Sequence, residues 1–140
     1  MIFHIKSMYF CISKHFFIIL GWVILTNKIE QFLLCFAALI IHELGHIITA
    51  ISLKEKINIF YLLPFGFCCR LKNQSNINSK NILKILIFGP VTSILVAGIL
   101  IFWTKEFALI NFMIGLLNLL PFGSLDGGRI FGILSNKKIN

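Results

Sequence analysis

The chain has 140 residues, of which 58% are hydrophobic and only 13% are charged. A soluble domain carries charges on about a quarter of its residues, so this composition excludes an ordinary soluble protein and indicates an integral membrane protein. The 13 basic residues outnumber the 5 acidic ones and give a formal net charge of +8, but they are spread over short loops. This spread argues against nucleic acid as a partner and favours attraction to the anionic lipid bilayer.

Four apolar runs predict an all-α polytopic membrane protein with about four transmembrane helices in a single domain, 1–140: residues 9–26, 31–53, 82–103 and 107–120. The second and third runs have the roughly twenty residues that a spanning helix needs. The first is interrupted by Lys14 and His15 and could instead be a signal-peptide core, although no small-x-small cleavage site follows it. The fourth is short and meets Pro121, which is expected to end it before it crosses fully.

Basic residues are distributed unevenly between the two sides of these runs. If the runs alternate across the membrane, eleven lysines and arginines fall on one side and two, Lys28 and Lys105, fall on the other. Such an excess marks the cytoplasmic side. We therefore expect a multi-pass cell-membrane protein whose termini both lie in the cytoplasm, together with the connection at residues 54–81.

That connection contains a β-prone segment, residues 57–68, which is interrupted by Pro64 and Gly66. The segment predicts a short membrane-associated β-hairpin. Because an exposed strand edge can pair with an extended polypeptide, the hairpin could hold a substrate for cleavage. A plain interfacial loop is the alternative.

The second run contains the sequence His42-Glu43-Leu44-Gly45-His46. On a helix, residues i and i+4 project from one face about 6 Å apart along the axis, so both imidazoles can reach one metal ion while Glu43 points at the water that the ion carries. The same pattern occurs by chance on solvated helices, but a solvated helix would not be flanked by apolar residues on both sides. Because ionisable groups are costly in hydrocarbon, we expect a functional site and zinc-dependent hydrolysis.

A hydrolytic zinc site needs three protein ligands and an open position, so the two histidines require a partner elsewhere in the chain. Among the acidic residues, Glu30, Glu55 and Glu106 lie at the ends of apolar runs, and Glu43 is expected to be the base. Asp126 remains, in a proline- and glycine-rich stretch that can bring a carboxylate close to a helix. An ordinary exposed Asp-Gly turn is the alternative for that stretch.

The two elements together resemble the signatures of the site-2 proteases, the intramembrane zinc metalloproteases of peptidase family M50. These signatures are HExxH in one transmembrane helix and NxxPxxxxDG in another, and both match in full at 42–46 and 118–127. The resemblance implies a buried Zn²⁺ site made by His42, His46 and Asp126. It also implies that Glu43 is the catalytic residue and that Asn118 helps to position the substrate, in a zinc metalloendopeptidase that cleaves a membrane-tethered protein.

Within that family, the compact layout looks most like the stage IV sporulation protein FB branch, whose members cleave a membrane-associated pro-sigma factor. The resemblance therefore implies a membrane-associated precursor as substrate, with a sporulation pro-sigma factor as the specific case, and it leaves open a membrane-embedded regulatory partner. No nucleic acid is expected as a partner.

The chain departs from the family pattern at two places. Ser93 stands three residues after Gly89-Pro90, where family members often carry Asn. The chain also ends eleven residues after Arg129, without the further spans of sporulation relatives. A catalytically inactive, client-binding relative is therefore the alternative to a protease. A zinc or proton transporter is a third reading, but few ionisable residues lie in the apolar runs outside the two motifs.

Overall fold

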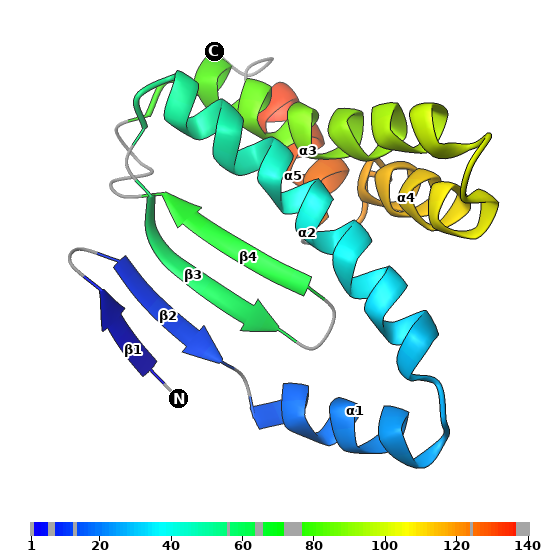
Figure 1. The fold of residues 1–140 in the computed structure, drawn as a ribbon. Helices are drawn as coiled ribbons and strands as arrows, with labels where there is room; N and C mark the ends of the chain where they lie inside the picture. Colours follow the sequence, from blue (N-terminus) through cyan, green and yellow to red (C-terminus); the bar gives the residue numbers. More distant parts are fainter. Residues whose placement is uncertain are drawn as a thin grey trace.

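The computed structural model describes residues 2–5, 8–12, 14–55, 57–63, 66–71, 77–123 and 125–136. In these residues, helices α2 to α5 gather on one side of the strands, whereas α1 lies apart from them near the end of α2 (Figure 1). The elements in chain order are β1 (Ile2–Ile5), β2 (Met8–Ile12), α1 (Lys14–Leu25), α2 (Ile29–Ser52), β3 (Ile57–Leu63), β4 (Gly66–Leu71), α3 (Ser79–Leu100), α4 (Lys105–Asn118) and α5 (Asp126–Asn136).

Helices α2 and α3 are the two in the described part of the chain that are long and apolar enough to cross a membrane. Their 24 and 22 residues extend roughly 36 and 33 Å, against a hydrocarbon core of about 30 Å. Their bounds lie within three residues of the runs expected at 31–53 and 82–103. Apolar side chains are exposed along both helices, as contact with lipid would require: Leu33, Leu44, Ile48, Ile51, Ile87, Leu95 and Ile99.

The N-terminal segment differs from the span expected at 9–26. Its first residues, from Tyr9 to Ile12, lie in strand β2, and α1 begins at Lys14 and has 12 residues. A helix of that length extends roughly 18 Å, which is too short to cross the hydrocarbon core. The apolar run before Lys14 suits a strand as well as a helix, and pairing with β3, which is distant in sequence, satisfies its backbone as a strand.

The four strands form one sheet in the order β1-β2-β3-β4. Strands β1 and β2 are antiparallel, β2 and β3 are parallel, and β3 and β4 are antiparallel, with Leu63 opposite Gly66. The last pair occupies the segment where the hairpin is expected and extends it to Leu71; residues 64, 65 and 72–76 lie outside the described part of the chain. The all-α expectation is therefore incomplete, because the N-terminal segment adds two strands to the hairpin.

Small residues allow α3 to pack closely against α2. A Cβ atom at Gly45 of α2 would collide with the carbonyl oxygen of Phe88 and with Oγ1 of Thr92, and one at Gly89 of α3 would collide with the imidazole of His46. Helices in membranes commonly use such residues to bring their backbones together. The backbone of α3 therefore passes directly alongside the His42 to His46 segment.

A polar contact joins the C-terminal end of α2 to the start of α3. Lys54, with φ of 59°, ends the helical path of α2 in a left-handed conformation. Beyond it, Oε1 of Glu55 accepts a hydrogen bond of 3.0 Å from Nδ2 of Asn81. Asn78 caps α3 by accepting a hydrogen bond from the backbone N–H of Lys80 at 3.0 Å. These contacts set where the two long helices meet at this end of the bundle.

Candidate metal centre

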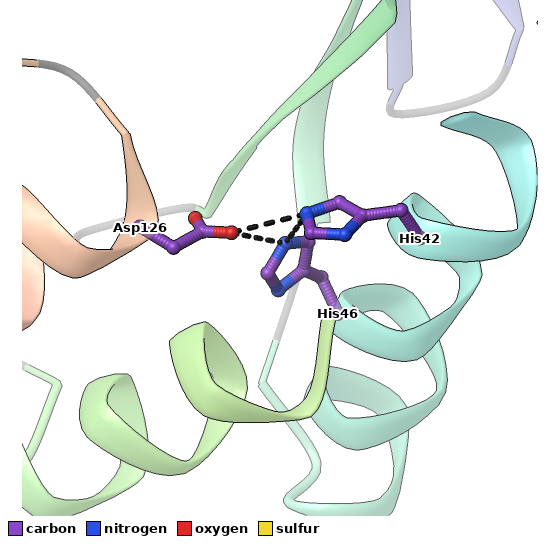
Figure 2. A group of neighbouring side chains, drawn as sticks. All are labelled: His42, His46 and Asp126. Atoms are coloured by element: carbon purple, nitrogen blue, oxygen red, sulfur yellow. Dashed lines mark hydrogen bonds and ion pairs between the residues drawn. The ribbon is translucent and has the colours of Figure 1, made fainter. Parts of the chain in front are cut away.

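Three predicted ligand side chains converge at one point in the bundle: His42, His46 and Asp126 (Figure 2). Nε2 of His42 and Nε2 of His46 each lie 3.1 Å from Oδ2 of Asp126, and the two nitrogens are 3.2 Å apart. All three residues are buried, with exposed fractions of 3%, 8% and 8%. The three donor atoms therefore form a compact triangle that is shielded from solvent.

The hydrogen bonding of His46 tests whether this triangle suits a cation. Nδ1 of His46 lies 2.7 Å from the carbonyl oxygen of Ile85, and because a carbonyl can only accept, this nitrogen carries a proton. A neutral His46 then presents a lone pair at Nε2 to an oxygen of Asp126, and two acceptors facing each other in a buried site are unfavourable. A cation between them removes that conflict. Two imidazole nitrogens and a carboxylate oxygen are a donor set that zinc takes.

Helix geometry explains the placement of the two histidines. They are four residues apart on α2, so their side chains project from the same face, with the rings 4.9 Å apart between centroids. That face turns toward α3, where Gly89 leaves room for the ring of His46.

Asp126 reaches the histidines because the chain folds back sharply after α4. It is the first residue of α5, and the segment before it includes Gly123 with φ of 52°, in the left-handed region that favours glycine. A Cβ at Gly127 would collide with the backbone of Leu119 and Leu120, so only glycine lets this segment close over the start of α5. The proline- and glycine-rich stretch therefore delivers a carboxylate to the face of α2.

Glu43 lies beside the triangle and is not one of its three members. It is half-buried and follows His42 on α2. The electrostatic partners that surround it are His46, Asp126 and Arg129. A carboxylate in this position is close to the centre and free of the contacts that join the three donor atoms.

Asn118 lies away from the donor atoms, at the last residue of α4. It is half-buried, and its Nδ2 donates to the carbonyl oxygen of Ile114 at 2.9 Å. Among the described contacts, none joins this side chain to the three donor residues.

The sequence did not predict two contacts that α3 makes with the histidines. One is the hydrogen bond between His46 and the carbonyl of Ile85, and the other joins Nδ1 of His42 to Oγ of Ser93 at 3.1 Å. Ser93 stood out in the sequence only as a departure from a pattern. The signal that could have identified it is its place four residues after Gly89, on the face of α3 that passes the histidines.

The chain is similar in sequence to curated proteins, although no family model matches it. It is 31% identical over 137 residues to a zinc metalloprotease of Methanocaldococcus jannaschii, a match covering 86% of this chain and 40% of the relative. It is 29% identical over 133 residues to stage IV sporulation protein FB of Bacillus subtilis, covering 84% of this chain and 46% of that protein. The chain thus spans less than half the length of these curated relatives.

The fold also matches a solved structure. The site-2 protease from Methanocaldococcus jannaschii superposes with a TM-score of 0.76 and 30% sequence identity. The match covers 96% of this chain and 71% of the solved one. Nearly all of the chain therefore takes part in the likeness.

Proposed function

The chain belongs to the site-2 protease family, and we propose that it is an intramembrane zinc metalloprotease that hydrolyses a peptide bond in a membrane-associated protein precursor. The observation that carries this proposal is the convergence of two Nε2 atoms and one carboxylate oxygen within 3.2 Å of one another, inside a bundle of apolar helices. Ionisable groups placed together in such surroundings are expensive and typically functional.

In this proposal His42, His46 and Asp126 are the metal ligands. Zn²⁺ bound there would supply Lewis acidity, which makes a water molecule more acidic and polarises the scissile carbonyl. The three residues leave a fourth position for the reacting groups, as catalytic zinc sites do. Their burial excludes competing bulk water and strengthens electrostatic interactions within the site.

Glu43 is the general base and then the general acid. Its carboxylate accepts a proton from the attacking water as the new carbon–oxygen bond forms, and it gives that proton to the leaving amine as the carbon–nitrogen bond breaks. The half-buried position of Glu43 beside the donor triangle supports this role. Arg129 lies near the same carboxylate and adds positive charge on that side of the site.

We place the whole chain in one transmembrane domain of the site-2 protease type, in a cell membrane. The excess of basic residues on one side supports cytoplasmic termini, and α1, α4 and α5 complete the domain around the two long helices. His46 lies six residues before Ser52, the last residue of α2, or roughly 9 Å below the end of the helix on helical rise. Water then enters from the cytoplasmic side.

Strand β4 is the surface that we assign to substrate presentation. It forms one edge of the sheet and packs against α2, the helix that carries the two histidines (Figure 1). A peptide bond inside a helix is shielded, and its backbone groups need partners once the helix unwinds. An extended segment paired with β4 would satisfy those groups next to the site. The likeness to stage IV sporulation protein FB supports a pro-sigma factor as the first substrate to examine.

The test is co-expression of the chain with membrane-tethered precursors, including a pro-sigma factor, followed by analysis of processing on gels. Glu43→Gln should abolish cleavage while keeping zinc, because it removes the base and leaves all three ligands. Asp126→Ala should lose both cleavage and tight zinc binding. If neither the wild-type chain nor Glu43→Gln cuts any precursor while both bind zinc stoichiometrically, the chain is a client-binding relative and the protease proposal is wrong.

We propose that Asn118 helps to position the substrate, because it is the first residue of the NxxPxxxxDG motif. It is the last residue of α4, and its side chain donates to the carbonyl oxygen of Ile114 in the same helix. Asn118→Ala should therefore raise KM with little change in kcat, because it would remove a binding contact and none of the reacting groups. A fall in kcat at unchanged KM, measured on a purified substrate, would contradict that assignment.

A further inference from the structure

One face of α3 contacts both histidines of the donor triangle. The residues on this face are Ile85, Gly89 and Ser93, each four residues from the next, so they lie almost in line along the helix. The carbonyl of Ile85 meets His46, the bare backbone of Gly89 accommodates its ring, and Oγ of Ser93 lies 3.1 Å from Nδ1 of His42. The face thus presents a carbonyl, a gap and a hydroxyl.

The carbonyl of Ile85 and the hydroxyl of Ser93 contact the ring nitrogens that face away from Asp126. In both histidines Nε2 points into the triangle and Nδ1 points to α3 (Figure 2). For His46 the carbonyl partner can only accept, which keeps the proton on Nδ1. For His42 the partner is a hydroxyl, which can accept from an Nδ1–H or donate to a bare Nδ1. The choice at His42 decides whether its Nε2 lone pair is available to a metal ion.

We propose that Ser93 is a positioning residue for the metal centre: its Oγ accepts the Nδ1–H of His42 and so holds the Nε2 lone pair of that ring toward the metal. Ser93 is completely buried, and Ile85 and Gly89 on the same face are buried as well, so solvent is not available to replace the hydroxyl. A ligand histidine ordinarily donates its second N–H to such a partner, which fixes both its tautomer and the orientation of its ring.

This role also explains how α3 can serve the two histidines unequally. His46 is held by a backbone carbonyl, which no side-chain substitution removes, whereas His42 depends on one hydroxyl. The site therefore has one orienting contact that is built into the fold and one that is set by residue identity. Of the two orienting contacts of the histidines, the one made by Ser93 is the one that a side-chain substitution can remove.

The inference rests on the proposed metal centre, and its test measures metal binding without reference to cleavage. The full chain in detergent is titrated with Co²⁺, whose visible absorption reports the ligand set, and zinc affinity is read by competition with a chelator. Ser93→Ala should weaken affinity about 10- to 100-fold, the usual loss when a ligand histidine is deprived of its partner. The absorption bands of bound Co²⁺ should also shift, because the imidazole of His42 is free to reorient.

Thr49→Val is the matched control. Thr49 is a buried residue on the same helix as the histidines, but its hydroxyl donates to the carbonyl of Gly45 at 2.8 Å and contacts no ligand. This variant should bind Co²⁺ with wild-type affinity and spectrum. The proposal is overturned if Ser93→Ala binds Co²⁺ like the wild type, or if Thr49→Val loses affinity to the same extent. A wild-type chain that binds no Co²⁺ would overturn the metal centre itself.

Discussion

The donor triangle is built from two halves that are held in different ways. The histidines lie within one long helix and are braced by α3 through a carbonyl, a hydroxyl and a close backbone contact at Gly89. Asp126 comes from the first residue of a short helix, after a segment whose side chains are mostly exposed. The described hydrogen bonds of its carboxylate include the histidines and no residue of α3 or α4.

This difference indicates that the histidine half is preformed and that the aspartate half is placed by backbone packing. A preformed half needs no metal to keep its geometry, because its partners belong to the protein. The aspartate half depends on Gly127 fitting beneath the backbone of Leu119. Displacing a histidine ring of the first half should therefore abolish metal binding, whereas moving the aspartate of the second half should weaken it and leave the histidine pair in place.

The largest effect on the histidine half is expected from Gly89→Ala. The added methyl group would collide with the ring of His46, which is easier to displace than the helix backbone. We expect metal binding and activity to be lost, together with a packing cost of about 1–3 kcal/mol. Gly98→Ala on the same helix, where a Cβ meets no atom within 4 Å, is the control and should retain both. If Gly89→Ala and Gly98→Ala bind zinc equally well, the histidine half is not preformed by its packing against α3.

Metal removal tests the two halves together. At a free zinc concentration of 1,000 times Kd, binding to the folded state should stabilise the chain by about 4 kcal/mol, and chelation should remove that stabilisation. Glu43→Gln should keep the effect because Glu43 is not among the three donors. Thermal unfolding in detergent, with and without a chelator, provides the measurement. If chelation leaves the Tm of the wild-type chain unchanged, bound metal does not stabilise the folded state.

Gly127→Ala should disturb only the aspartate half. The methyl group would push the start of α5 away from Leu119 and move Asp126, while the histidines keep their contacts with α3. Zinc affinity should fall about 10- to 100-fold, comparable to the loss of a ligand's supporting contact, without vanishing. Gly132→Ala, also on α5 but in open space, should bind zinc normally. Complete loss of binding in Gly127→Ala would show that the two halves are not independent.

The smallest effect is expected at the end of the α2–α3 pair. Asn81→Ala removes the hydrogen bond from Nδ2 to Oε1 of Glu55, which is partly solvent-exposed. Such a bond contributes about 1 kcal/mol to stability, and zinc affinity should not change. Unfolding free energy and zinc titration measured on one preparation separate the two effects. A change in zinc affinity would mean that this polar contact, and not the close packing at Gly89, sets the spacing of the helices.

The long helices and the donor residues were accessible from the sequence because their signals are local. Apolar runs of spanning length predict α2 and α3, and ligand spacing within one helix predicts the orientation of His42 and His46. Asp126 followed from the shortage of acidic residues. The structure brings these three side chains together as expected. Their assignment as ligands remains a prediction for the zinc measurements to decide.

The remaining features depend on contacts between distant segments. The run from Met8 to Ile12 reads as helix or strand until its pairing with Ile59 to Leu62 is known. The contact of Ser93 with His42 depends on the position of α3 along the axis of α2, and no local sequence pattern specifies that position. The glycines at 89 and 127 are likewise ordinary in sequence, and only the neighbouring atoms reveal why a side chain cannot stand there.

The four-residue spacing on α3 also limits how the length of the chain can vary. One residue inserted between Ile85 and Ser93 would turn Ser93 about 100° around the helix and advance it by about 1.5 Å, carrying its hydroxyl off the face that meets His42. A substitution at an outward position such as Ile87 changes only what touches lipid. In homologous chains that keep the metal centre, this stretch of α3 should therefore vary freely in outward side chains and admit neither insertions nor deletions.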